Sequence, residues 1–229
     1  MKISTKGRYA LRVMLELSDH DRDEYVPLSV IAKKQEISEK YLESILVVLS
    51  KAGAIDALLD DGAQALIFDV RNNGGGYKDE LVKILDRLLP EGILFQSKDY
   101  SGTKQTDRSD AACIELPMAV LVNQDSYSAA EFFAAALQEY DWAKVVGEKT
   151  CGKGNFQTAF TLSDGSMLNL SIGKYYTPQG RSLTDLGVMP DVEIALSDED
   201  GAKLYYGQLE KADDAQLQAA IREITQKLS

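Results

Sequence analysis

The chain has 229 residues, of which 45% are hydrophobic and 27% are charged, and its formal net charge is −11. A chain of this length buries a full core and accommodates one or two domains. The acidic balance argues against a general affinity for nucleic acid or anionic membranes. No segment has the ~18 consecutive apolar residues of a membrane span, and the basic N-terminus lacks the apolar run of a signal peptide. We therefore expect a cytoplasmic protein without a membrane span.

The acidic excess lies almost entirely after residue 54. Residues 1–54 contain 9 Lys and Arg and 8 Asp and Glu, whereas the remaining residues contain 16 and 28. This difference predicts two units of different origin. The two cysteines, Cys113 and Cys151, match neither a disulfide framework nor a metal-ligand spacing, so we expect no metal and no cofactor.

Residues 1–53 have the pattern of three short helices. Apolar residues recur at helical spacing in residues 9–17, 28–35 and 38–50, and Gly53 is a typical residue just after a helix end. This order is typical of a helix-turn-helix, whose last helix enters the major groove of DNA. We expect a small all-α segment here and place the boundary of the first domain at Gly53.

Three stretches in this segment carry a family signature: Lys2-Ile-Ser-Thr-Lys-Gly-Arg-Tyr-Ala10, Tyr41-Leu-Glu43 and Leu49-Ser-Lys-Ala-Gly53. They resemble the bacterial winged-helix transcription factors of the iron–sulfur-cluster regulator family. In that family an Arg- and Gly-rich wing and a long dimerisation helix come next, but acidic residues follow Gly53 here. Two interpretations stay open, a DNA-binding segment and a helical appendage without specific DNA binding. The first implies DNA contacts from Lys2, Lys6, Arg8, Ser38, Lys40 and Tyr41.

Residues 54–229 alternate between helical and extended patterns, which predicts an α/β domain with its ligands at the carboxyl ends of the strands. Residues 98–112 are polar, and we expect a mobile loop there. The pattern predicts helices at 54–60, 79–89, 128–140 and 212–228, strands at 65–70, 93–96, 118–122 and 144–147, and hairpin strands at 156–162 and 167–172.

The most informative pattern pairs Ser128, where a strand meets a helix, with Lys153, in a second glycine-bracketed loop. The chain has one histidine, His20, far from this region, which argues against a Ser-His-Asp triad. Lysine is the remaining well-attested base for a serine nucleophile. A lysine acts as a base only when neutral, so its site must favour the neutral amine. Gln157 could orient that amine by accepting a hydrogen bond.

Each residue also has a simpler interpretation. A serine at this position is more often a helix N-cap, and a loop lysine is usually solvated. The chemistry also needs amides that hold an oxyanion. The amide of Ala129 begins the helix, and the glycines at 74–76 allow a second backbone amide to approach the same point.

Four further stretches occur together in this part of the chain: Asp69-Val-Arg-Asn-Asn-Gly-Gly-Gly76, Ser126-Tyr-Ser-Ala-Ala-Glu131, Val146-Gly-Glu-Lys-Thr-Cys-Gly-Lys-Gly154 and Tyr175-Tyr-Thr-Pro-Gln-Gly-Arg-Ser182. In their order and spacing over about 140 residues they resemble the carboxyl-terminal processing (tail-specific) serine peptidases. The family uses a Ser/Lys dyad on a crotonase-like α/β core. The resemblance implies that Ser128 is the nucleophile, Lys153 the base and Gln157 its orienting partner, with oxyanion amides from Ala129 and Gly75 or Gly74.

The sequence also departs from this family. The family normally has a signal peptide or anchor, a PDZ domain and a first core strand, and it is usually extracytoplasmic. We expect residues 54–229 to be a peptidase core without the PDZ domain. Three hypotheses follow: a serine endopeptidase that cleaves polypeptides near the carboxyl end, a DNA-binding regulator, or an inactive chimera joined near Gly53. The closing helix at 212–228 packs on the core or on a second subunit, so a homo-oligomer is one expectation.

Overall fold

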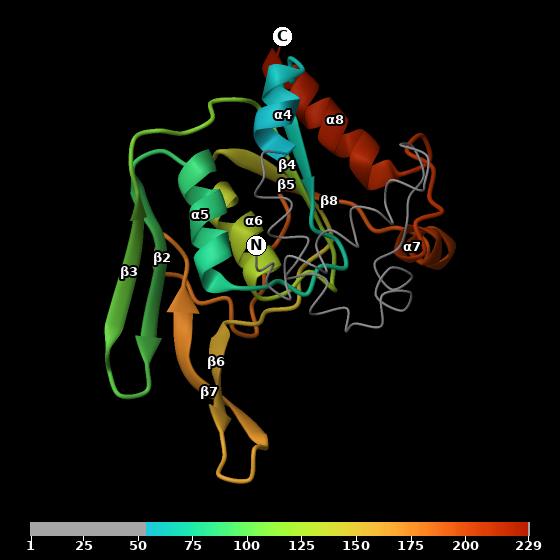
Figure 1. Cartoon of the computed structure of the whole chain (residues 1–229). Helices are drawn as coiled ribbons and strands as arrows, with labels where there is room; N and C mark the ends of the chain where they lie inside the picture. The colour runs from blue at the N-terminus through green and yellow to red at the C-terminus, as the bar shows by residue number, and fades with distance from the viewer. Residues whose placement is uncertain (1–53, 229) are drawn as a thin grey trace, which may run out of the picture. The chain divides into compact units, whose positions relative to one another are not determined.

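The computed structural model describes residues 54–228 (Figure 1), so the predicted helix-turn-helix and its DNA-contact candidates, Lys2 to Tyr41, lie outside the described residues. The chain divides into two compact units. The described part of the first consists of residues 54–63 and 198–209, and that of the second of residues 64–197 and 210–228. In the first unit, helix α4 (Ala54–Asp60) was predicted and α7 (Asp198–Tyr205) was not.

A four-stranded parallel sheet forms the core of the second unit. Its strands are β1 (Leu66–Asp69), β4 (Met118–Val122), β5 (Ala143–Gly147) and β8 (Val192–Glu193), in the order β1-β4-β5-β8. All five residues of β4 are buried, as the continuous apolar run predicts for a central parallel strand. The predicted α/β class is confirmed.

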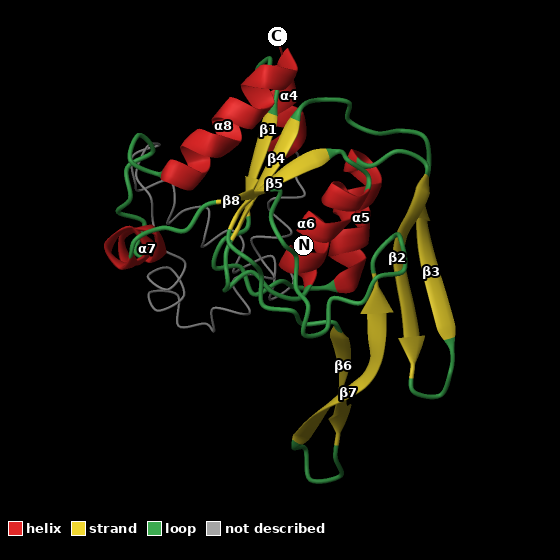
Figure 2. Cartoon of the chain, turned by 180° about the vertical axis from the view of Figure 1, so that it is seen from behind, coloured by secondary structure: helices red, strands yellow, loops and turns green. Residues whose placement is uncertain are grey.

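Helices cover both faces of this sheet. Helix α8 (Ala215–Leu228) places Ala219, Ala220 and Ile224 against buried residues of β4 and β5. Helices α5 (Lys78–Leu88) and α6 (Ala129–Glu139) lie on the other side of the strands (Figure 2). Four alanines of α6 are buried and allow close packing along the helix, namely Ala130, Ala134, Ala135 and Ala136.

A second, antiparallel sheet has the order β3-β2-β7-β6. Its strands are β2 (Gly92–Asp99), β3 (Lys104–Ser109), β6 (Asn155–Thr161) and β7 (Met167–Tyr176). The prediction of a mobile loop at 98–112 was wrong, because β3 pairs with β2 throughout its length. Polar side chains suit β3 because it is an edge strand, and an ion pair of 2.7 Å joins its Asp107 to Lys78 of α5.

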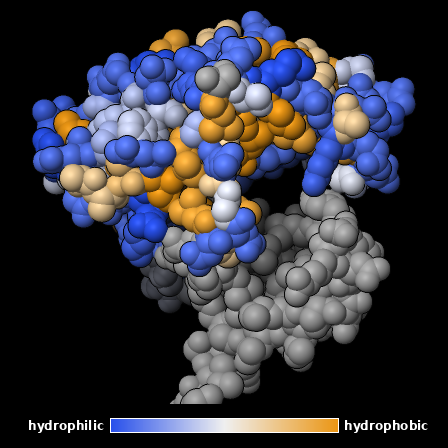
Figure 3. All heavy atoms as spheres, turned by 90° about the horizontal axis from the view of Figure 1, so that it is seen from above, coloured by the Kyte–Doolittle hydropathy of each residue, from blue (hydrophilic) through white to orange (hydrophobic). Residues whose placement is uncertain are grey.

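The surface is mixed in character. The face seen in Figure 3 is largely hydrophilic, and apolar side chains gather toward its middle. Apolar atoms supply more than half of the surface of an ordinary folded protein, so this patch alone indicates no binding site. Within residues 54–228, no helix is long and apolar enough to cross a bilayer.

Candidate active site

Three loops leave the parallel sheet at the carboxyl ends of adjacent strands. They follow β1, β4 and β5, and the strand register aligns Asp69 with Leu121 and Val122 with Gly147. The side chain of Asn123 connects the first two loops. It accepts a hydrogen bond from the Asn72 backbone amide at 2.9 Å and donates one to the Asn72 side chain at 2.8 Å. The expected convergence of the loops is therefore present.

Ser128 lies immediately before α6 with φ 61° and ψ −123°. A residue other than glycine is strained in this conformation, at a cost of about 1–3 kcal/mol. The Ser128 side chain makes no capping hydrogen bond to the helix, so the simpler interpretation as an N-cap does not account for it. A strained serine at a strand-to-helix turn, with its hydroxyl not committed to the helix, is the arrangement of a nucleophile elbow.

We expect Ser128→Gly to raise the free energy of unfolding by about 1 kcal/mol relative to Ser128→Ala, because glycine adopts this backbone conformation without strain. Urea denaturation of the two variants measures the difference. Both variants lack the hydroxyl, so the difference in their stability reports the strain of the backbone at position 128. A less stable glycine variant would show that the backbone at this position is not strained.

The glycine loop at 74–76 packs against Ser128 and Ala129. A side chain at Gly75 would lie 2.5 Å from the Ala129 nitrogen and 3.0 Å from the Ser128 Cβ, and Gly75 has φ 83°. Glycine is therefore required for this close approach. The Gly75 amide donates to the Asn73 side chain at 2.8 Å, and Gly74 lies against the Tyr127 hydroxyl.

Glu131 holds the lysine-bearing loop in place from the first turn of α6. Its side chain is fully buried and accepts hydrogen bonds from the Thr150 hydroxyl, from the Gly152 amide at 2.6 Å and from the Lys153 amide at 2.9 Å. This one carboxylate therefore fixes the 150–153 loop to the helix that Ser128 precedes. The half-buried Lys153 places its amine 5.5 Å from the centre of the Tyr127 ring.

Tyr175, on β7, joins the two halves of the site. Its phenol donates to the carbonyl of Lys153, and the Ser128 hydroxyl is near enough to influence the pKa of the same phenol. Burial raises the pKa of Tyr175 well above its ordinary value, and the contact with Ser128 opposes that shift in part. The phenol therefore stays protonated at neutral pH and can donate at the point where the serine and lysine loops meet.

Gln157 does not reach this centre. It lies exposed on β6 opposite Ser171, just past an irregularity in register between Phe156 and Gln157. Among the described residues its side chain has no hydrogen-bond partner, so the structure brings together Ser128, Ala129, the 74–76 glycines and the Lys153 loop without the Gln157 side chain.

A cluster of ion pairs around the buried Arg71 lies at the start of the glycine loop. The Arg71 guanidinium contacts Asp69 at 2.6 Å and Asp214 at 2.7 Å, and it also donates to the Gln216 side chain at 2.9 Å. Burial disfavours ionisation of Asp214, but the hydrogen bonds and charge of Arg71 outweigh burial and lower the pKa of this carboxyl. The cluster ties the start of the 72–76 loop to the segment that leads into α8.

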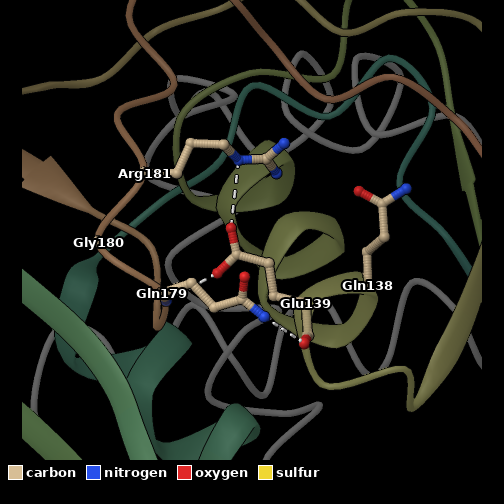
Figure 4. A pocket seen from close by; sticks show the side chains of 5 residues that line it. All are labelled: Gln138, Glu139, Gln179, Gly180 and Arg181. Atoms are coloured by element: carbon tan, nitrogen blue, oxygen red, sulfur yellow. Dashed lines mark hydrogen bonds and ion pairs between the residues drawn. The ribbon is translucent and has the colours of Figure 1, made fainter.

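A second carboxylate acts at the other end of α6. Glu139 accepts from the Gln179 amide at 2.9 Å and from Arg181 at 3.2 Å, and these residues line an open pocket with Gln138 and Gly180 (Figure 4). The pocket is separated from Ser128 by the length of the helix, so it is not the proposed reaction centre. Within residues 54–228, no cluster of three or more His, Cys, Asp or Glu residues is arranged to hold a metal ion.

The sequence profile of peptidase family S41 matches residues 50–194, more than half of the chain. The chain belongs to peptidase family S41. The predicted resemblance to the processing peptidases is thereby confirmed. A carboxyl-terminal-processing protease of Synechocystis sp. is 36% identical over 175 residues, which cover 76% of this chain and 40% of that protein. A probable CtpA-like serine protease of Staphylococcus aureus is 38% identical over 138 residues, which cover 58% of this chain and 28% of that protein.

Structural comparison agrees with the S41 assignment. The solved structure of a photosystem II D1 C-terminal processing protease matches with a TM-score of 0.59 and 34% identity, over 65% of this chain and 39% of that chain. The chain thus spans 40% or less of the length of these three relatives. Residues 3–59 match a second profile, described as an iron-dependent transcriptional regulator, which confirms the resemblance of the first segment.

Two side chains of this S41 site received no role in the sequence analysis. Glu131 and Tyr175 lie in the recognised motifs, but their hydrogen bonds to the lysine loop connect positions about 22 residues apart along the chain. One available signal was the acidic residue in the first turn of a helix whose next six residues are apolar, because a buried carboxylate needs hydrogen-bond donors.

Proposed function

We propose that this chain is a serine peptidase that hydrolyses polypeptides near their carboxyl end through a Ser128/Lys153 dyad. The observation that carries the proposal is Ser128 itself, held in a strained turn before α6 with its side chain not used as a helix cap. Family membership supports the reaction class. The loop contacts of Glu131 and Tyr175 support the pairing of the serine with the lysine loop.

In the proposed reaction, the Ser128 hydroxyl attacks the scissile carbonyl while the Lys153 amine accepts its proton. The amide of Ala129 stabilises the oxyanion, together with that of Gly75 or Gly74. The amide bond breaks, the leaving amine takes the proton from Lys153, and an acyl ester remains on Ser128. Water, deprotonated by the same amine, then hydrolyses the ester.

Two groups must change partners for this chemistry. The Gly75 amide is engaged by Asn73, and the amine of Lys153 lies against the Tyr127 ring. A bound substrate carbonyl would replace the Asn73 oxygen at Gly75, and the amine would turn from the ring toward Ser128. Such rearrangement on substrate binding is common, because catalytic hydrogen bonds often tighten only in the complex.

Incubation with an unstructured peptide that ends in apolar residues tests the proposal, with the products identified by mass spectrometry. We expect cleavage close to the carboxyl end by the wild-type chain and none by Ser128→Ala. Equal cleavage by both proteins would contradict the assignment of the nucleophile. Absence of cleavage by a wild-type chain that unfolds cooperatively would contradict the proposed activity of this chain.

Replacing Glu131 with glutamine is expected to lower kcat about 10- to 100-fold, because the amide group of glutamine cannot accept all three hydrogen bonds and the Lys153 loop shifts. Steady-state kinetics with the same peptide measures the effect. Glu139→Gln is the matched control, since Glu139 lies on the same helix but holds the 177–181 turn. An equal fall in kcat for both variants would indicate general loss of structure.

A second candidate function is DNA binding by the first segment. The match of residues 3–59 to an iron-dependent transcriptional regulator profile supports it. Under this hypothesis Lys2, Lys6, Arg8, Ser38, Lys40 and Tyr41 contact the duplex, and the retarded fraction in an electrophoretic mobility assay falls steeply as salt rises. Absence of any retardation at low salt would leave the segment as a helical appendage.

A further inference from the structure

The outer half of the β6–β7 hairpin has an apolar face that no other described residue covers. Strand β7 pairs with β2 only at Gly173–Tyr176, so Met167–Ser171 pair with β6 alone. This part extends away from α5 and α6 in both views (Figures 1 and 2). A two-stranded hairpin of this kind is marginally stable in water without further packing.

The strand register separates the side chains of this hairpin into two faces. Phe160 is opposite Leu168, and Thr158 is opposite Leu170, so these four share one face. The side chains of this face are nearly half exposed: Phe160 by 45%, Leu168 by 44% and Leu170 by 45%. The other face carries Gln157, Ala159, Thr161, Met167, Asn169 and Ser171. The hairpin therefore has one apolar and one mainly polar face, and the apolar face lacks a cover among the described residues.

Both ends of the hairpin are fixed to the helix that follows Ser128. The 150–153 loop, which leads into β6, is held by Glu131, and the 177–181 turn, which follows β7, is held by Glu139. Strand β6 begins two residues after Lys153. A chain segment bound along the hairpin is consequently held at a fixed position relative to the proposed reaction centre.

We propose that this apolar face, made by Phe160, Leu168 and Leu170, docks an extended apolar segment of the polypeptide substrate. The inference rests on the proposed function and adds a substrate requirement to it. Strand β6 is the edge of its sheet and pairs only with β7, so its outer edge can also hydrogen-bond an added strand. At ~3.3 Å per residue, the docked segment lies roughly 4–7 residues from the scissile bond.

Charge and area favour a peptide over a second copy of the chain. Residues 155–172 contain one charged residue, Asp164, within a chain of net charge −11. Two such chains repel each other through their net negative charge, whereas a hairpin with a single charged residue does not repel an uncharged peptide. Three half-exposed side chains offer on the order of a few hundred Å², below the ~800 Å² per partner of a stable protein–protein interface.

The test compares Phe160→Ser/Leu168→Ser with Met167→Ser, which makes the same kind of change on the opposite face at a residue that is 70% exposed. The first probe is a fluorescein-labelled peptide of roughly 16 residues, long enough at ~3.3 Å per residue to place a leucine–valine run on the hairpin and its carboxyl end at Ser128. The second is a short peptide that has only the carboxyl-terminal part. Anisotropy is measured in a Ser128→Ala background and hydrolysis in the parent chain.

We expect the double variant to bind the long peptide at least about tenfold more weakly and to hydrolyse the short peptide at the wild-type rate, with Met167→Ser unchanged in both assays. Unchanged binding of the long peptide would overturn the docking surface and leave the proposed function intact. Loss of long-peptide binding without hydrolysis of either peptide by the parent chain would support the surface and count against the proposed activity. A dimer that sediments in the parent chain and is lost in the double variant, with peptide binding unchanged, would overturn the proposal in favour of self-association.

Discussion

Replacing Lys153 with alanine is expected to lower kcat/KM for peptide hydrolysis at least about 10³-fold, since a positioned general base contributes about 10²–10⁴-fold and no described residue can replace its amine. The lysine loop is fixed by backbone hydrogen bonds to Glu131, so the alanine variant keeps the loop in place. Stopped assays with a chromogenic peptide, followed to long times, measure the residual rate.

Lys149→Ala is the matched control, because Lys149 is exposed in the same loop. We expect it to retain wild-type kcat/KM. A lysine that acts as a base must be neutral. The rate of hydrolysis by the wild-type chain should therefore also rise with pH, and it should level off once the amine is fully deprotonated. Wild-type activity in Lys153→Ala would contradict the dyad, whatever the behaviour of Ser128→Ala.

Replacing Arg71 with methionine is expected to lower the free energy of unfolding by about 3–5 kcal/mol, because it leaves a buried carboxylate without its partner. The Asp214 side chain is 5% exposed and lies 2.7 Å from the guanidinium. Urea denaturation measures the change. The double variant Arg71→Met/Asp214→Asn is the control, and we expect it to recover part of the loss because the buried carboxylate at position 214 is removed and the remaining one, Asp69, is partly exposed.

The pH dependence of this effect follows from the lowered pKa of Asp214. A carboxyl whose pKa is lower in the folded state stabilises the fold above its unfolded pKa, and this contribution disappears as pH falls through the folded pKa. In Arg71→Met the same carboxyl stays buried without its cationic partner, so its protonated form is more favoured than in the wild type. The difference in stability between wild type and variant should therefore shrink toward acid pH. A difference that is constant from neutral to acid pH would contradict the role assigned to the pair.

The apolar runs predicted β1, β4 and β5 of the parallel sheet, because burial leaves little choice of residue in such strands, but not the two-residue strand β8. Strand β3 was missed for the opposite reason, since an edge strand made of Lys104–Ser109 has no apolar face to reveal it. Helix α7 was missed because it has no buried residue and therefore no apolar stripe. Hydrophobic periodicity in a sequence reveals an element only where one of its faces is buried, and β3 and α7 have few buried residues.

The sequence predicted which loops form the site, because motif spacing and parallel-strand topology both place these loops at one edge of the sheet. The sequence did not reveal that Glu131 and Tyr175 hold the lysine loop, since these contacts depend on packing between distant segments. The orienting role of Gln157 was implied by the family resemblance, which does not reveal where its side chain lies. Gln157 lies exposed on β6, just past the irregularity in register at Phe156 and Gln157. Its role as the orienting partner stays a prediction, as does the domain boundary at Gly53.

The most direct test of the central claim is covalent labelling with a fluorophosphonate probe that reacts with activated serine hydroxyls. Intact-mass spectrometry of the wild-type chain should show one adduct, and peptide mapping should place it on Ser128. The Ser128→Ala variant should show none, and Lys153→Ala should label far more slowly while Lys149→Ala labels at the wild-type rate. A folded wild-type chain that takes up no probe, or labels at a serine other than Ser128, would contradict the account.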